Sequence, residues 1–102
     1  MSSYRLAPAA TDDLFEAYLQ GYDLFGQRQA DAYQEGATRL FERLAEYPRL
    51  GRELAELTPP VRVIPYGSHV VIYEAVSDGV TILRVRHGHE DWTSSPLGGH
   101  PE

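Results

Sequence analysis

Apolar residues in the first half of this chain recur with a helical period, whereas those in the second half follow a strand-like period. Between Pro8 and Gly26 they return every three or four positions, which places them on one face of a helix. The stripe consists of Leu14, Phe15, Tyr18, Leu19, Tyr22 and Phe25. Proline suits the first turn of a helix, and glycine suits its end. The pattern therefore predicts a first helix from Pro8 to Gly26.

A second helix is predicted from about Gln27 to Tyr47, and Pro48 ends it. Its apolar face consists of Ala30, Tyr33, Ala37, Leu40, Phe41 and Leu44. Gly36 lies inside this helix and costs about 1 kcal/mol relative to alanine, so we expect it to pack closely against the first helix. Two amphipathic helices joined by a short link form an antiparallel hairpin whose apolar side needs a partner.

The second half of the chain supplies that partner. Val61–Tyr66, His69–Val76 and Val80–His87 are rich in β-forming residues, and short turn sequences separate them. Tyr4–Ala7 alternates weakly and is read as a further strand. The predicted fold is α+β, a single domain in the order β-α-α-β-β-β, with a helical hairpin packed on a mainly antiparallel four-stranded sheet. We assign residues 1–92 to this domain and residues 93–102 to a flexible C-terminal tail.

The register of the last hairpin has two possible solutions. A two-residue Asp-Gly loop would place Glu74 on the core side of the sheet. A three-residue loop with a left-handed Gly79 would instead place Glu74 on the outer side. Its neighbours there would be Val70, Ile72, Ile82, Arg84 and Arg86, leaving Val71, Tyr73, Leu83 and Val85 for the core. An unpaired buried carboxylate is costly, so the sequence favours the second solution.

Composition narrows the class of protein. The net charge is −6 and all nine basic residues are arginine, which argues against broad binding to nucleic acid. There is no cysteine, so disulfides and thiol nucleophiles are excluded. No apolar run resembles a signal peptide, and the longest, Val70–Tyr73, is far too short to span a bilayer. We therefore expect a cytoplasmic protein that does not associate with a membrane.

Several local strings, in their order and spacing, resemble the ParE toxins of the RelE/ParE superfamily from about Tyr4 to Trp92. They are Tyr4-Arg5-Leu6, Pro8-Ala9-Ala10, Asp13-Leu14, Phe25-Gly26, Gln29-Ala30, Tyr33, Glu46–Arg52, Arg62, Pro65-Tyr66-Gly67, His69–Tyr73, Ile82–Gly88 and Asp91-Trp92. The resemblance implies the toxin of a type II toxin–antitoxin system, which inhibits DNA gyrase by binding and without catalysis. It also implies a ParD-like antitoxin with a ribbon-helix-helix domain, contact with operator DNA only through that antitoxin, and no cofactor.

Two features depart from the family pattern. Glu74 stands where many ParE toxins have arginine, and the chain is acidic where they tend to be basic or near neutral. Two alternatives therefore stay open. One is a RelE-like ribosome-dependent mRNA endoribonuclease, and the other is a decayed toxin that only binds antitoxin.

Candidate site residues follow from the resemblance and from the chemistry of arginine and tyrosine at interfaces. The predicted antitoxin-binding residues are Tyr18, Tyr22, Arg62, Ile72, Arg84 and Arg86, and the predicted target-binding residues are Arg84, Arg86, His87 and Trp92. The helices carry more aromatic area than one small sheet can cover, which favours an exposed groove for an antitoxin helix. Trp92 is expected to fold back onto the domain.

Catalytic and metal-binding interpretations are weaker. In the ribonuclease alternative, Arg62 and Arg84 would hold phosphate and His87 would transfer the proton. His87, His89, Glu90 and Asp91 are zinc-ligand types, but such neighbours in one loop are more simply read as a solvated turn. No metal site is predicted.

Overall fold

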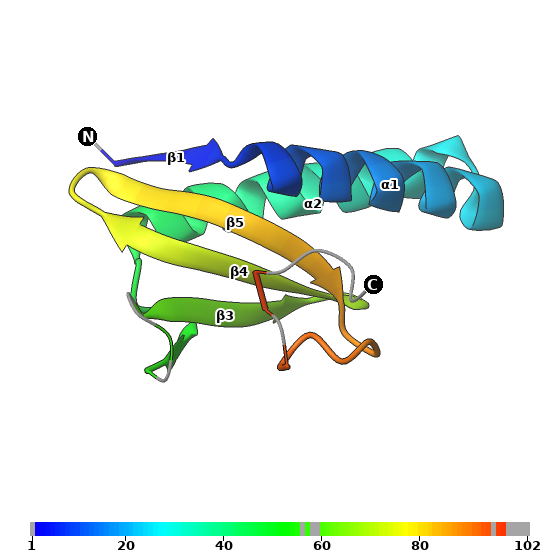
Figure 1. Ribbon diagram of the computed structural model, residues 1–102. Coiled ribbons are helices and arrows are strands. Elements are labelled where there is room, and N and C mark those ends of the chain that lie inside the picture. The colour runs from blue at the N-terminus through cyan, green and yellow to red at the C-terminus, as the bar shows by residue number, and fades with distance from the viewer. Residues whose placement is uncertain (1, 56, 58–59, 95, 98–102) are drawn as a thin grey trace.

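The sheet and the helical hairpin form two layers. The computed structural model describes residues 2–55, 57, 60–94 and 96–97. Its elements are β1 (Ser3–Leu6), α1 (Pro8–Phe25), α2 (Gln27–Glu46), β2 (Arg52–Leu54), β3 (Val61–Tyr66), β4 (His69–Val76) and β5 (Gly79–His87). Both helices cover the same face of the sheet (Figure 1). The predicted α+β architecture is confirmed.

The sheet has five strands in the order β1-β5-β4-β3-β2, one more than the four predicted. β1 is parallel to β5, and the other neighbouring strands are antiparallel. The additional strand, β2, pairs through Arg52–Leu54 with β3. A run of only three residues carries no alternating pattern long enough to identify a strand from sequence.

The sheet carries an apolar cluster on each face. The larger one lies under the helices and consists of Ala10, Ala37, Phe41, Leu44, Ala45, Val71, Tyr73, Val80, Ile82 and Val85. The smaller one lies on the opposite face and consists of Leu54, Val61, Val63, Val70 and Ile72. Trp92 packs on this second cluster, so the expectation that it folds back is confirmed.

The two helices differ in how much they bury. α2 buries Ala30, Ala37, Phe41, Leu44 and Ala45, whereas α1 buries Ala10 alone. Five large apolar side chains of α1 are instead exposed. They are Phe15, Leu19, Tyr22, Leu24 and Phe25.

The predicted core positions Val71, Tyr73 and Val85 are confirmed, but the predicted three-residue loop and the faces predicted for Ile82 and Leu83 are wrong. Val76 pairs with Gly79, so the loop is the two residues Ser77 and Asp78. Tyr73 pairs with Ile82 but Ile72 with Arg84, which leaves a bulge at Leu83. Ile82 therefore lies in the core under the helices, and Leu83 packs on the opposite face of the sheet. After the bulge, Val85 again faces the core. A bulge adds one unpaired residue, and no periodicity argument reveals its position.

Gly36 packs against the sheet and not, as expected, against the first helix. A methyl group at this position would collide with the hydroxyl group of Tyr66 in β3. That hydroxyl group donates a hydrogen bond of 2.8 Å to the carbonyl oxygen of Tyr33. The glycine thus allows α2 to lie close to β3.

The segment after β5 lies against the sheet face that the helices leave open (Figure 1). Pro96 is buried within this segment, inside the region predicted to be a flexible tail. The rest of that tail includes residue 95 and residues 98–102, which lie outside the described residues. No helix in the described part of the chain is long and apolar enough to cross a membrane.

Candidate partner-binding surface

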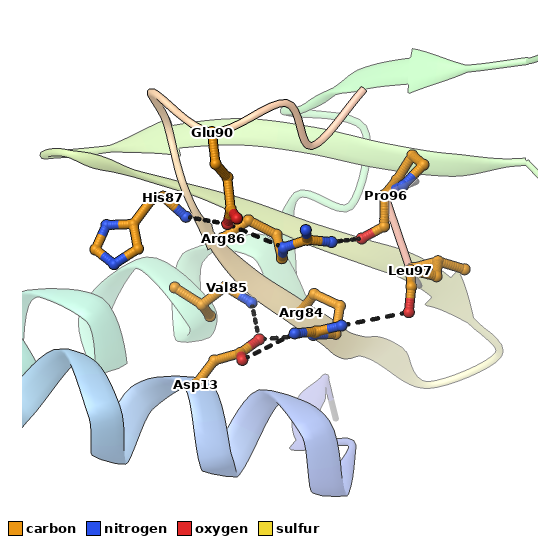
Figure 2. Close-up of polar contacts among 8 residues, drawn as sticks. All are labelled: Asp13, Arg84, Val85, Arg86, His87, Glu90, Pro96 and Leu97. Atoms are coloured by element: carbon orange, nitrogen blue, oxygen red, sulfur yellow. Dashed lines mark hydrogen bonds and ion pairs between the residues drawn. The ribbon is translucent and has the colours of Figure 1, made fainter. Parts of the chain in front are cut away.

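An ion pair joins α1 to the bulge of β5. Asp13 accepts hydrogen bonds from Arg84 Nε at 2.7 Å, from Arg84 Nη2 at 3.1 Å and from the backbone N–H of Val85 at 2.9 Å (Figure 2). Both side chains are mostly buried, at 16% exposure for Arg84 and 17% for Asp13. Hydrogen bonding to Asp13 raises the pKa of Arg84. β1 pairs with β5 only as far as Ile82, and beyond that point the carboxylate that binds Arg84 also accepts the hydrogen bond of the Val85 N–H.

Arg86 is held by the segment that follows β5. Its Nε donates to Glu90 Oε1 at 3.1 Å and its Nη1 donates to the carbonyl oxygen of Pro96 at 3.0 Å (Figure 2). Glu90 also accepts a hydrogen bond from the backbone N–H of His87 at 3.0 Å. The hydrogen bond from Arg86 lowers the pKa of Glu90. Arg84 and Arg86, two of the three arginines predicted to contact a partner, are therefore engaged within the chain.

Three histidine rings contact one another in tilted arrangements beside the helical hairpin. The ring centroids of His69 and His87 lie 4.7 Å apart, and those of His87 and His89 lie 5.1 Å apart. His69 is only 7% exposed, and its Nδ1 lies 2.7 Å from the hydroxyl oxygen of Tyr33. Burial, reinforced by the neighbouring His87, lowers the pKa of His69. The neutral imidazole is therefore the favoured form at neutral pH.

These histidines form one wall of a groove of about 340 Å³ between the hairpin and the ends of β4 and β5. The other walls include Ala17, Tyr18, Gly21, Leu24, Phe25, Ala30 and Tyr33. None of the residues around the groove carries a formal charge when its histidines are neutral. Such a groove suits an apolar side chain of a partner.

Arg62 lies at the opposite end of α2, where it braces the loop between α2 and β2. Its Nη1 donates to the carbonyl oxygen of Gly51 at 2.7 Å. Tyr73 spans the same loop, because its hydroxyl group donates to Pro48 O at 2.7 Å and accepts from the Gly51 N–H at 2.8 Å. Burial raises the pKa of Tyr73. A structural role for Arg62 is thus visible in the structure.

The predicted site residues do not form one surface. Tyr18 and His87 both border the groove, and Tyr22 is exposed on α1. Trp92 lies on the opposite face of the sheet from the helices. Ile72 was predicted to contact the antitoxin, but it is fully buried in the second apolar cluster and offers no surface to a partner.

The residues around His87 do not form a metal site. Among the described residues, no group of three or more histidine, cysteine or acidic side chains is arranged to hold a metal ion. Glu90 binds Arg86, and Asp91 accepts hydrogen bonds from Thr93 at 3.1 Å and Ser94 at 2.8 Å. These acids organise the turn after β5.

A comparison with known protein families identifies the family to which this chain belongs. The family described as the ParE toxin of the type II toxin–antitoxin system parDE matches residues 4–92. The chain belongs to the ParE toxin family. This places it in the RelE/ParE superfamily and confirms the resemblance read from its local strings.

Individual relatives agree with this assignment. The chain is 35% identical over 91 residues to Toxin ParE1 of Mycobacterium tuberculosis, covering 88% of this chain and 93% of that toxin. It is 33% identical over 63 residues to Toxin ParE3 of Caulobacter vibrioides, covering 62% of this chain and 63% of that toxin. A chain of the chromosomal ParDE system from P. aeruginosa shares the fold of this ParE-family chain. The TM-score is 0.71 at 19% identity, over 85% of this chain and 96% of that one.

Sequence reasoning missed the roles of four residues in this ParE-family chain. Sequence analysis named Asp13 only within a string that resembles the family, because its partner Arg84 lies 71 residues away. His69 gave no signal, since its neighbours come from α2 and β5. Phe15 and Leu19 were assigned to a widened core stripe, and the exposed fractions of 60% and 45% follow from how α1 sits on the sheet.

Proposed function

We propose that this chain is a growth-arresting toxin that binds DNA gyrase and is neutralised by a ParD-like antitoxin. The antitoxin carries a ribbon-helix-helix domain, and operator DNA is contacted only through it. Membership of the ParE family supports the proposal, together with the 35% identity to Toxin ParE1 over nearly the whole chain.

The main support for a binding mechanism, as opposed to RNA cleavage, is that Arg84 and Arg86 are each paired with an acidic residue of the chain. Each guanidinium group has a carboxylate partner within the chain. Stabilising the charge that develops on a phosphate during cleavage requires cations directed at the substrate. These features favour recognition of a protein.

The groove and the adjoining face of α1 are the surfaces we assign to partner binding. Tyr18 and Tyr22 remain proposed antitoxin contacts, and His87 remains a proposed target contact. Arg84 and Arg86 are proposed to act by fixing the end of β5 against α1 and against the segment with Trp92. Buried ion pairs hold geometry well even where they add little net stability.

Supercoiling by purified gyrase tests the proposal directly. The chain is expected to inhibit supercoiling, and adding its antitoxin first is expected to prevent the inhibition. The reaction is run beside a translating ribosome assay for mRNA cleavage, with His87→Ala as a variant. Intact supercoiling at large toxin excess, together with cleavage that His87→Ala abolishes, would establish the ribonuclease alternative. Antitoxin binding without either activity would establish a decayed toxin.

A further inference from the structure

A second exposed apolar surface lies at the end of the domain where α2 stops. Tyr47 and Leu50, in the loop between α2 and β2, are 60% and 44% exposed. They border an open pocket of about 740 Å³, which we call the loop pocket, and its wall also includes Pro48 and Pro60. Large apolar side chains that gather around a pocket on the surface mark a contact site.

The loop that carries these two side chains is fixed from below by buried groups. The fully buried Tyr73 donates to Pro48 O at 2.7 Å and accepts from the Gly51 N–H at 2.8 Å. Arg62 Nη1 donates to Gly51 O at 2.7 Å. A Cβ atom on Gly51 would lie 2.7 Å from both the Tyr73 hydroxyl oxygen and the Val63 carbonyl oxygen, so no side chain fits there. The loop backbone is therefore preorganised while its large apolar side chains stay in solvent, which reduces the entropy lost on binding.

The loop pocket carries more negative than positive charge. Its acidic side chains come from the end of α2, from β2 and from β4, and they are Glu46, Glu53 and Glu74. Within the part of the chain that the structure describes, none of the three forms an ion pair. Of the two arginines at the pocket, Arg62 directs its Nη1 at backbone carbonyl oxygens of the loop. An apolar surface with a surplus of carboxylates complements a cationic partner.

The loop pocket is far from the groove that the histidines border. The groove is lined by Ala30 near the start of α2, whereas the loop pocket is lined by Tyr47 just after its end (α2 in Figure 1). A rise of 1.5 Å per residue separates these two positions by about 25 Å along the helix axis. Two different partners can therefore occupy the two surfaces at the same time.

We infer that the loop pocket binds a basic segment of the toxin's target. An apolar side chain of that segment packs on Tyr47 and Leu50, and an arginine or lysine beside it meets the carboxylates, which gives register and fast association. The inference rests on the proposed function and gives the target a contact away from Tyr18 and Tyr22, the proposed antitoxin contacts on α1. A second copy of the chain in a symmetric contact would instead bring the same carboxylates together, and like charges oppose association.

The first test compares two leucines of similar exposure, Leu50 at 44% in the loop pocket and Leu97 at 45% after β5. With the full chain and purified gyrase, Leu50→Asp is expected to raise the toxin concentration for half inhibition of supercoiling about tenfold, and Leu97→Asp less than about twofold. Glu53→Lys with Glu74→Lys is expected to match Leu50→Asp at low salt and to have a smaller effect at high salt. Antitoxin affinity is expected to stay within about twofold of the parent in all three. Circular dichroism verifies each fold, and Tyr47→Ala replaces Leu50→Asp if that variant does not fold.

A second probe does not depend on gyrase. Two labelled peptides of equal length share one leucine and carry either arginines or glutamates on both sides of it. Only the arginine peptide is expected to bind the native chain, and Glu53→Lys with Glu74→Lys is expected to reverse this preference. Antitoxin added beforehand is expected to change the affinity of the arginine peptide less than about twofold, because the two surfaces are separate.

Several results would each overturn the inference. They are equal binding of the two peptides, gyrase inhibition that ignores Leu50→Asp, loss of antitoxin binding in Leu50→Asp, and a dimer of the native chain that Leu50→Asp dissociates. A native chain that does not inhibit gyrase would overturn the proposed function alone, because the peptide preference decides the loop pocket separately.

Discussion

α1 and α2 lie side by side on the same sheet, yet they use their apolar residues in opposite ways. α2 buries five residues, including Phe41 and Leu44, in contact with the sheet. α1 is nearly as long but buries Ala10 alone and leaves Phe15 and Leu19 exposed. Burial of large apolar side chains is the main source of folding free energy. The difference therefore separates a helix that stabilises the domain from a helix that is available to a partner.

Truncating one leucine in each helix gives the largest contrast. Leu44→Ala removes a fully buried side chain from α2 and is expected to lower the free energy of unfolding by about 2–5 kcal/mol. Leu19→Ala in α1 is expected to change it by less than about 0.5 kcal/mol. Unfolding in guanidinium chloride measures both. Equal losses would show that α1 contributes to the core as much as α2 does.

The exception within α1 is Asp13, which ties the helix to β5. Asp13→Asn is expected to lower the free energy of unfolding by about 1–3 kcal/mol, because Arg84 loses its carboxylate partner while remaining mostly buried. Asp12→Asn, at the exposed neighbouring position, serves as the control and should have little effect. Denaturant titration of the two variants distinguishes them. If Asp12→Asn lowered the free energy of unfolding as much as Asp13→Asn, the loss would come from the charge of the helix in general and not from the pair with Arg84.

Glycine-to-alanine changes are expected to have opposite signs in the two helices. Gly36→Ala in α2 is expected to destabilise by about 1–3 kcal/mol, because the methyl group collides with Tyr66. Gly21→Ala in α1 meets only Ala30, at an ordinary 3.9 Å, and is expected to stabilise by up to about 1 kcal/mol. Thermal melts report both. A Gly36→Ala variant that melts higher than the parent would contradict the close approach of α2 to β3.

The smallest expected effect is the acid sensitivity of stability at the contact between His69 and Tyr33, in the first half of α2. The pKa of His69 is lowered from 6.5 in the folded chain, so below about pH 6.5 the unfolded state binds more protons. Stability is therefore expected to fall as pH decreases from 6.5 towards the folded pKa. Glu90 acts in a lower window, since its pKa is lowered from 4.5 and its contribution is lost only below that value. Melting curves from pH 7 to pH 5 measure the effect, with His69→Gln expected to flatten it and His89→Gln to preserve it.

The layers of the fold could be predicted from sequence because each long element has a clear period. The helical stripes and the three β-rich runs gave the element order, and Trp92 was correctly expected to fold back. The features that were not predicted are either too short to show a period or depend on residues that are far apart in the sequence. β2 has only three residues, and the bulge at Leu83 changes the face of Ile82 without changing composition.

Prediction of the site succeeded less well, for a reason visible in Arg84. Arginine at that position was correctly noticed, but whether it faces a partner or an internal acid depends on Asp13, which only the folded chain brings near. Ile72 was assigned to a surface and is buried, because a segment after the last strand covers that face. Periodicity indicates which residues share a side, but it does not indicate what lies on top of them.

β1 has a consequence for the timing of synthesis. Its partner is β5, where Ser3 pairs with Gly79 and Leu6 with Ile82, so the first strand to leave the ribosome waits for the last. Residues 7–78 separate β1 from the first residue of its partner strand. The pairing of β1 therefore forms only after β5 has been synthesised. Until that point, a nascent chain holds β1 without the strand that completes the sheet.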